Sequence, residues 1–250
     1  MRKILPAYDY LYLGDNLHVP HGNRSCKEII FLTRRTTSFF REKKCALVIF
    51  ACNTATALAL PTIQKEFEGE IKDLGIVRPT SEFLANHHFG KVGFIGTTNT
   101  IKTNIFYSDF KKAFPQKELV FCQNDCLGLV EEIEGGELEG ENLKKILAAC
   151  LMPLKKEKID ALVLGCTHYN LITRQIDNLM SEVRIITQGE IVAEKLRDYL
   201  KRHGDLEKKL SRRHSLDLYF TKDNPSYPFL VKTFLGEEET RQLKLAEIKL

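Results

Sequence analysis

Two cysteines of this sequence, Cys52 and Cys166, stand where an apolar run ends and a polar turn begins. Each is followed at once by hydroxyl, amide or imidazole groups, in the segments Ala46-Leu-Val-Ile-Phe-Ala-Cys52-Asn53-Thr54 and Ala161-Leu-Val-Leu-Gly-Cys166-Thr167-His168. A thiol has an ordinary pKa near 8.5, so near neutral pH it can accept a proton as a thiolate or donate one as a thiol. Two thiols on opposite sides of one carbon could therefore remove a proton from one face, return a proton to the other, and invert the stereocentre.

The elements around these cysteines should position them for such chemistry. Ligands of open α/β sheets bind beyond the carboxyl ends of the strands, so both thiols are expected to face crevices. The turn after each cysteine should lead into a helix, whose N-terminal amides favour a thiolate or a substrate carboxylate. The repeated pattern predicts two similar half-structures facing one cleft. The alternative for either cysteine alone is a small buried packing residue, the commoner role of a lone cysteine at a strand end.

The remaining cysteines lack such neighbours and are predicted to be packing or incidental residues: Cys26, Cys45, Cys122, Cys126 and Cys150. Seven cysteines, an odd number in a chain of 250 residues, do not indicate a disulfide framework. No Cys-x-x-Cys pair and no Cys/His spacing indicates zinc, so no metal site is predicted. No lysine motif of pyridoxal phosphate enzymes and no Rossmann glycine fingerprint is visible, so no organic cofactor is expected.

Short apolar runs alternate with longer amphipathic stretches along the chain, which predicts an α/β fold with mainly parallel sheets. Strands are expected at Tyr10 to Leu13, Ala46 to Phe50, Leu74 to Val77, Val92 to Ile95, Leu119 to Phe121, Ala161 to Leu164, Val183 to Ile186 and Leu216 to Phe220. Several are rich in Val, Ile and Leu without alternation, as in strands covered on both faces. Ser25 and Glu28 have the form of a capping box that starts a helix. A further helix is expected to start near Thr54 and to continue through Ile63, with Pro61 in or near its first turns.

The composition, 43% hydrophobic and 28% charged, is that of an ordinary globular protein with a substantial core, arranged as one large domain or two smaller ones. The formal net charge of +4 is mild. The basic cluster Lys208, Lys209, Arg212 and Arg213 is expected on the solvated surface, with a phosphate or nucleic-acid site as the alternative. No apolar stretch is long enough for a membrane helix and no signal-peptide core follows Met1, so a cytoplasmic protein without a membrane partner is predicted.

At the cysteine motifs the sequence resembles glutamate racemase, within the wider aspartate/glutamate racemase superfamily. The motifs that carry the resemblance are, in order, Gly14-Asp15 with Pro20-His21-Gly22, Ala51-Cys52-Asn53-Thr54-Ala55, Gly96-Thr97-Thr98-Asn99-Thr100-Ile101 and Leu164-Gly165-Cys166-Thr167-His168-Tyr169. Weaker similarity continues from Gln188-Gly189-Glu190 to Phe234-Leu235-Gly236. The resemblance implies two pseudo-symmetric α/β domains with a cleft between them. The first would be discontinuous, with residues 1–77 and 188–250, and the second would span residues 78–187.

The resemblance also implies roles for individual residues. Cys52 would handle the α-proton of the D-isomer and Cys166 that of the L-isomer, with His168 assisting Cys166. The residues expected to bind the substrate are Asn53, Thr54, Thr97, Thr100, Thr167, Pro20, His21 and Gly22.

An acidic helper is also implied, and Glu131 is the expected residue, with Glu132 as a close competitor. Both lie in an acidic stretch with Glu134 and Glu137. The alternative for this stretch is a solvated face without a catalytic role.

The sequence departs from the family in several places. The family opens with a strand and a glycine-rich turn that carries an Asp-Ser pair, and nothing of that kind precedes Leu5-Pro6. Without that strand, neighbouring strands of the first sheet would keep unpaired amides and carbonyls, so we expect the authentic start to lie upstream and Met1 to be an internal methionine. His21 stands where the family usually has tyrosine, and Asn170 stands where proline is common.

The sequence therefore predicts interconversion of L- and D-glutamate, which in the family supplies D-glutamate for peptidoglycan. Glutamate is the expected partner, a homodimer is the default expectation, and nucleic acid is not expected because no recognition module is evident. One alternative is a racemase for a related substrate, such as aspartate or a hydantoin. The other is a catalytically impaired family member that acts as a binding or regulatory protein.

Overall fold

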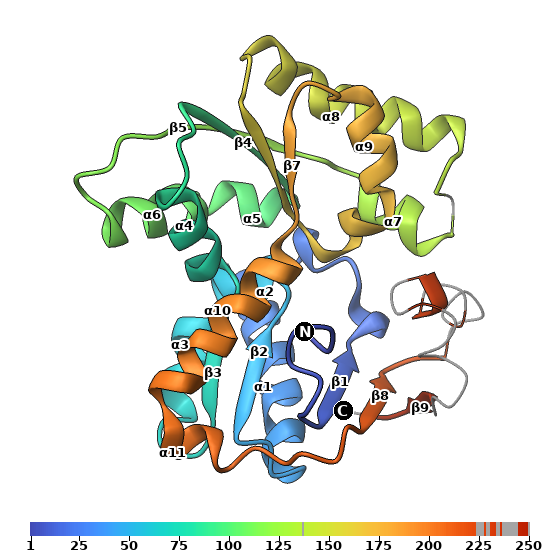
Figure 1. The fold of residues 1–250 in the computed structure, drawn as a ribbon. Coiled ribbons are helices and arrows are strands. Elements are labelled where there is room, and N and C mark those ends of the chain that lie inside the picture. The colour runs from blue at the N-terminus through green and yellow to red at the C-terminus, as the bar shows by residue number, and fades with distance from the viewer. Residues whose placement is uncertain (137, 224–227, 229–230, 234–235, 237–244, 250) are drawn as a thin grey trace.

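The computed structural model describes residues 1–136, 138–223, 228, 231–233, 236 and 245–249. It has two parts, and every strand pairing among these residues is parallel. In Figure 1 the elements from α4 (Val77–Ala85) to β7 (Arg184–Ile186) form the upper part, and the other elements form the lower part. The predicted α/β class with mainly parallel sheets is confirmed. The domain boundaries near residues 77 and 187 stay a prediction.

The upper part is built on a sheet of order β5-β4-β6-β7. Its other strands are β4 (Lys91–Gly96), β5 (Val120–Asp125) and β6 (Ala161–Gly165), and its other helices are α5 (Thr98–Lys102), α6 (Ile105–Ala113), α7 (Leu129–Glu134), α8 (Glu141–Lys156), the 3-10 helix η3 (Thr167–Ile172) and α9 (Thr173–Leu179). Leu162 and Leu164 of β6 belong to the core formed with α7, α8, η3 and α9. Ala161 and Val163 belong to the core formed with α4 and α6. Strand β6 is buried throughout, which explains its unbroken apolar sequence.

The lower part contains two smaller sheets. One has the order β1-β8-β9 and the other pairs β2 with β3. The strands are β1 (Tyr10–Gly14), β2 (Leu47–Phe50), β3 (Lys72–Gly75), β8 (Leu216–Phe220) and β9 (Leu245–Glu247). The helices are the 3-10 helices η1 (Asn16–His18) and η2 (His21–Asn23) with α1 (Cys26–Glu42), α2 (Asn53–Leu58), α3 (Leu60–Glu66), α10 (Gln188–Arg202) and α11 (Gly204–Glu207).

Residues at the N-terminal end lie between the two lower sheets (Figure 1). Leu5 is buried with Leu196 and Leu200 of α10, and this cluster also contacts Tyr10 of β1 and Leu47 of β2. Strands β1 and β2 therefore belong to separate sheets instead of pairing through a common neighbour.

Some predicted elements have different bounds in the structure. The strand expected at Leu74 to Val77 lies two residues earlier and ends at Gly75, because helix α4 begins at Val77. The helix expected from Thr54 is divided at Ala59 into α2 and α3. Pro61 lies in the first turn of α3, where a missing backbone N–H breaks no helical hydrogen bond. The sequence did not predict strand β9.

One correction concerns the cysteines. Cys126 and Cys150 are joined by a disulfide, with their Cα atoms 5.2 Å apart. Both are buried in the core of the upper part, as expected of packing residues. The sequence did not indicate the bond, because only the packing of α8 against β5 brings the two residues together.

Other predictions concern the basic cluster and membrane-spanning segments. The basic cluster Lys208, Lys209, Arg212 and Arg213 is exposed, as expected, and Arg212 forms an ion pair with Glu207. In the portion of the chain that the structure describes, no helix is both long and apolar enough to cross a bilayer. Glu137, Phe234 and Leu235 lie outside the described residues.

Candidate active site

Cys52 lies between strand β2 and helix α2, at the N-cap of the helix, where the sequence placed it. Its Sγ atom is 4.0 Å from Nδ1 of His21, which belongs to η2. Burial raises the pKa of Cys52, but the hydrogen bond and positive charge of His21 and the amides of Ala55 and Thr54 outweigh burial and bring the pKa to about 7. Cys52 is therefore partly ionised near neutral pH, in the form that accepts a proton.

Asp15 lies on the other side of the His21 ring. Its Oδ2 atom is 3.6 Å from Nε2 of His21. Its Oδ1 atom accepts a hydrogen bond from Thr221 at 2.8 Å and lies 2.7 Å from Nδ1 of His18. Burial lowers the pKa of His21, but Asp15 and Cys52 raise it to about 9. The sequence assigned His21 to the substrate and gave Asp15 no chemical role.

Cys166 has the matching position after strand β6 and is buried. Its Sγ atom is 3.7 Å from Nδ1 of His168, and Nε2 of His168 is 2.5 Å from Oε1 of Glu134. Burial lowers the pKa of His168, but Cys166 and Glu134 raise it to about 10. The ring is therefore an imidazolium near neutral pH, held between a thiol and a carboxylate.

The carboxylate that contacts His168 is Glu134, whereas the sequence favoured Glu131 and then Glu132. Glu131 is exposed, and its carboxylate accepts a long hydrogen bond of 3.5 Å from Asn23. Glu132 accepts a hydrogen bond from Asn142 at 2.5 Å. Glu134, at the end of α7, alone among the three touches the imidazole that adjoins Cys166.

Tyr12 of β1 is electrostatically near groups of both parts, and no motif of the sequence pointed to it. Desolvation and the negative charges of Glu134 and Cys52 raise the pKa of its phenol to about 12. Glu134 belongs to the upper part and Cys52 to the lower part. Both therefore lie within electrostatic reach of the same phenol.

Three threonine hydroxyls form a closed triangle between the two parts. Thr54 Oγ1 lies 2.9 Å from Thr97 Oγ1 and 3.1 Å from Thr100 Oγ1, and the latter two atoms are 3.0 Å apart. Gly22 comes so close to this triangle that a Cβ atom on it would lie 2.4 Å from Cβ of Thr97. The structure thus brings three of the expected substrate-binding residues against the turn of residues 20–22.

Asn53 is buried at the start of α2, with a free acceptor. Its Nδ2 atom donates a hydrogen bond of 2.7 Å to Gln188, whose own amide donates to Thr80 at 2.9 Å. Its Oδ1 atom has no hydrogen-bond partner within the described residues. Buried polar atoms are usually paired, so this oxygen is suited to a water or to the ammonium group of a ligand. Thr167, half-buried, follows Cys166 directly.

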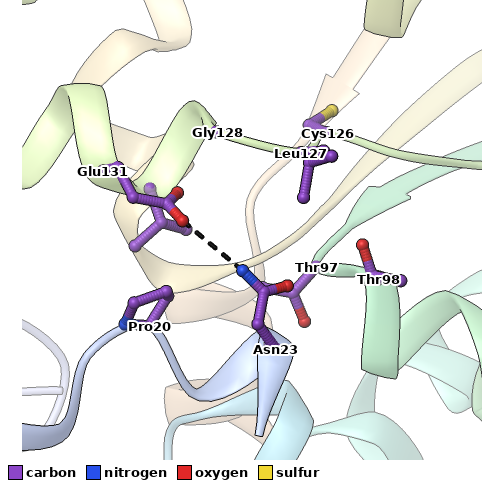
Figure 2. A pocket seen from close by; sticks show the side chains of 10 residues that line it. Pro20, Asn23, Thr97, Thr98, Cys126, Leu127, Gly128 and Glu131 are labelled. Carbon is purple, nitrogen blue, oxygen red and sulfur yellow. Dashed lines mark hydrogen bonds between the residues drawn. The ribbon is translucent and has the colours of Figure 1, made fainter.

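A small pocket lies beside the threonine triangle (Figure 2). Its wall includes Gly22 and Asn23 from the lower part and Thr97, Thr98 and Glu131 from the upper part. Figure 2 shows the Asn23 side chain pointing toward Glu131. Neither Cys52 nor Cys166 lines this pocket, whose Thr97 is hydrogen-bonded to Thr54, two residues after Cys52.

These groups together can carry out proton transfer on an amino acid. Each thiol adjoins an imidazole, and each imidazole faces a carboxylate. The hydroxyl groups of the threonine triangle and the amide of Asn53 are directed donors and acceptors suited to a zwitterion. Within the described residues, no group of three or more His, Cys, Asp or Glu side chains is arranged to hold a metal ion.

Comparison with known proteins agrees with this chemistry. Residues 2–196 match the profile of Asp/Glu/hydantoin racemases. The chain belongs to the Asp/Glu/hydantoin racemase family. It is 34% identical over 239 residues to a glutamate racemase of Aquifex aeolicus (strain VF5), which covers 95% of this chain and 88% of that protein. A glutamate racemase of Aquifex pyrophilus is 33% identical over 240 residues, which cover 96% of this chain and 88% of that one. This family member is thus an amino-acid racemase, an isomerase.

Solved structures give the same picture. Glutamate racemase isoform RacE1 from Bacillus anthracis superposes with a TM-score of 0.87 at 26% identity, covering 100% of this chain and 91% of that one. Glutamate racemase from Francisella tularensis subsp. tularensis SCHU S4, in complex with D-glutamate, gives 0.84 at 25% identity, with 100% and 90% covered. The predicted two-domain α/β fold is confirmed by these similarities.

Proposed function

We propose that this protein interconverts L- and D-glutamate by two-base proton transfer, with Cys52 and Cys166 as the two bases. The observation that carries the proposal is the repeated pairing of a thiol with an imidazole at a strand end, once in each part of the molecule. Relatives at 33–34% identity over most of their length are glutamate racemases, which supports glutamate as the substrate in preference to aspartate.

In the direction from D to L, the Cys52 thiolate accepts the α-proton of bound D-glutamate. The C–H bond breaks, its electron pair stays on the α-carbon, and an S–H bond forms on Cys52. Cys166, as a thiol, donates its proton to the opposite face of that carbon, which leaves a thiolate and L-glutamate. In the reverse direction the two thiols exchange roles. A positioned acid/base group of this kind typically contributes about 10² to 10⁴-fold in rate.

We assign the binding of the substrate to the groups between the thiols. Asn53 offers its free oxygen to the ammonium group, and the hydroxyls of Thr54, Thr97, Thr100 and Thr167 offer donors to the carboxylates. The turn of residues 20–22 borders the same space. The reaction needs only acid/base groups of the chain, so the proposal includes no cofactor.

We further propose that the D-glutamate formed enters peptidoglycan, the role that the resemblance to glutamate racemases implies. Expression of the chain is expected to restore growth of a bacterial strain that depends on added D-glutamate. The Cys52→Ser variant, produced at the same level, should fail to do so. Growth with that variant would contradict the link between the thiol and the biological role.

The direct test measures racemisation of each glutamate enantiomer by circular dichroism. Cys52→Ser and Cys166→Ser should each abolish full racemisation, whereas Cys26→Ser, which changes an exposed thiol outside the site, should retain it. Near-normal turnover by either of the first two variants rejects the two-thiol mechanism. Faster turnover of aspartate than of glutamate rejects the substrate. Stabilisation by D-glutamate without any turnover would favour a binding protein.

A further inference from the structure

The His21 ring faces the carboxylate of Asp15. Oδ2 of Asp15 and Nε2 of His21 are both buried, and neither has a hydrogen-bond partner within the described residues. The two atoms lie 3.6 Å apart, slightly beyond hydrogen-bond distance. Buried polar atoms are usually paired, and catalytic hydrogen bonds are often long before the substrate binds. A shift of a few tenths of an ångström would join the two atoms.

We propose that His21 is a further catalytic residue, the middle member of a relay in which Asp15 positions the imidazole and the imidazole acts on the Cys52 thiol. The inference deepens the proposed function and rests on it for the identity of the reaction. Its contacts are independent of the substrate, since Nδ1 of His21 lies 4.0 Å from Sγ of Cys52 and Nε2 faces Asp15.

The second thiol has the same order of groups. In the upper part, Nδ1 of His168 faces Cys166 and Nε2 faces Glu134. Both rings therefore present the same nitrogen to the thiol and the same nitrogen to a carboxylate. A two-base racemase uses each thiol both as an acid and as a base. Each thiol therefore needs a neighbouring group that can hold its proton, and an imidazole beside each thiol meets this need.

Within the relay, His21 holds the proton that Cys52 releases. The S–H bond breaks, its electron pair stays on sulfur, and an N–H bond forms at Nδ1, so that a thiolate lies beside an imidazolium. Burial opposes both charges, yet the mutual contacts bring the pKa of Cys52 to about 7 and that of His21 to about 9. Between these values the ion pair is the main form, and the thiolate is ready for the α-proton.

The turn that carries His21 is fixed from the upper part of the molecule. Nδ2 of Asn99 donates to the backbone oxygens of His21 at 3.3 Å and of Arg24 at 2.7 Å. Gly22 lies against Thr97. A residue that served only to border the substrate would need neither the buried Asp15 behind its ring nor the thiol in front of it.

The test follows the thiol itself and requires no turnover. Iodoacetamide reacts with thiolates, so the rate of Cys52 carboxamidomethylation against pH, read by peptide mass spectrometry, reports its ionisation. In folded His21→Asn protein this rate at pH 7 should fall about tenfold, because the pKa returns toward its ordinary value. Asp15→Asn should give a smaller fall in the same direction. The rate at Cys166 in the same samples is the internal control and should stay constant.

Among the described residues, the other titratable groups near this site are His18 beside Asp15 and Tyr12 near Cys52, and His21→Asn changes neither of them. An unchanged pH profile of Cys52 in that folded variant overturns the proposal. If His21→Asn does not fold, NMR titration of the His21 ring in the unaltered protein and in Cys52→Ser replaces the test. Loss of the thiolate should lower the pKa of the ring, and an unaltered ring pKa overturns the relay.

The kinetic isotope effect on racemisation reports specifically on proton removal by each thiol. In His21→Asn, proton removal by Cys52 should become slower, so the isotope effect with α-deuterated D-glutamate should rise more than that with α-deuterated L-glutamate. His168→Asn is the matched control and should show the reverse asymmetry. Equal changes for both enantiomers would mean that His21 acts only through structure. A chain that does not racemise glutamate but shows the shifted thiol profile would contradict the proposed function and keep the relay.

Discussion

Replacement of Glu134 by glutamine is expected to slow racemisation more than replacement of Glu131. Glutamine keeps the shape of the side chain and removes the charge that lies 2.5 Å from Nε2 of His168. Both side chains are about one-fifth exposed, so solvent screens the pair only in part. A hydrogen bond to a charged group contributes about 1.5–3 kcal/mol. If that energy is lost in the transition state, kcat falls by roughly 10- to 150-fold.

The assay is racemisation in both directions by circular dichroism, together with NMR titration of His168. Burial opposes the charge on His168, and its pKa of about 10 depends on Glu134 and Cys166, so the variant should titrate about 1–3 units lower. Its activity should therefore decline at a lower pH than that of the unaltered protein as the imidazolium is lost. Glu131→Gln should cost about threefold or less, because an exposed carboxylate in a long contact contributes little. A larger loss in Glu131→Gln than in Glu134→Gln refutes this reasoning.

Two further predictions concern stability. Asp73 is 2% exposed, and its carboxylate oxygens lack hydrogen-bond partners within the described residues. Desolvation raises the pKa of Asp73 from 3.8 to about 6, so the folded protein should lose stability as pH rises between these values. Asp73→Asn should remove this loss and raise the free energy of unfolding at pH 7, measured with urea, by about 1–3 kcal/mol. An unchanged pH dependence of stability in the variant would contradict this prediction. Gly22→Ala should lose about 1–3 kcal/mol and raise KM, because its Cβ would meet Thr97 at 2.4 Å, whereas Gly189→Ala, with open space around it, should not destabilise. Equal melting temperatures for these two variants would contradict this prediction, because they would show that the turn of residues 20–22 accommodates the added Cβ atom without cost.

The sequence predicted the positions of both cysteines because each follows an apolar strand. In β6 every residue is apolar and buried, so the end of the strand and the place of Cys166 follow from the pattern. Strand β3 was placed less well, because the apolar side chain of Val77 is buried in the core that packs against helix α4 and not in the sheet. An apolar run alone does not distinguish these two reasons for burial.

The sequence placed His168 beside Cys166, two residues away, but the acidic partner of His168 and the histidine partner of Cys52 were harder to predict. Glu131 and Glu134 lie three residues apart on α7, near one face of the helix, and only the placement of η3 decides which of them meets His168. His21 meets Cys52 only because the turn of residues 20–22 packs against α5. Contacts of this kind depend on how distant segments pack, and no local spacing in the sequence encodes them.

The source of the hydrogen on the α-carbon shows whether two thiols act on its opposite faces. D-glutamate is converted in deuterated water, and the α-position of substrate and product is read by mass spectrometry during the first turnovers. L-glutamate should carry deuterium from the start, since Cys166 delivers a deuteron derived from the solvent, while unreacted D-glutamate keeps its original hydrogen. L-glutamate that retains the original α-hydrogen would show that one base serves both faces, and would rule out the two-thiol mechanism.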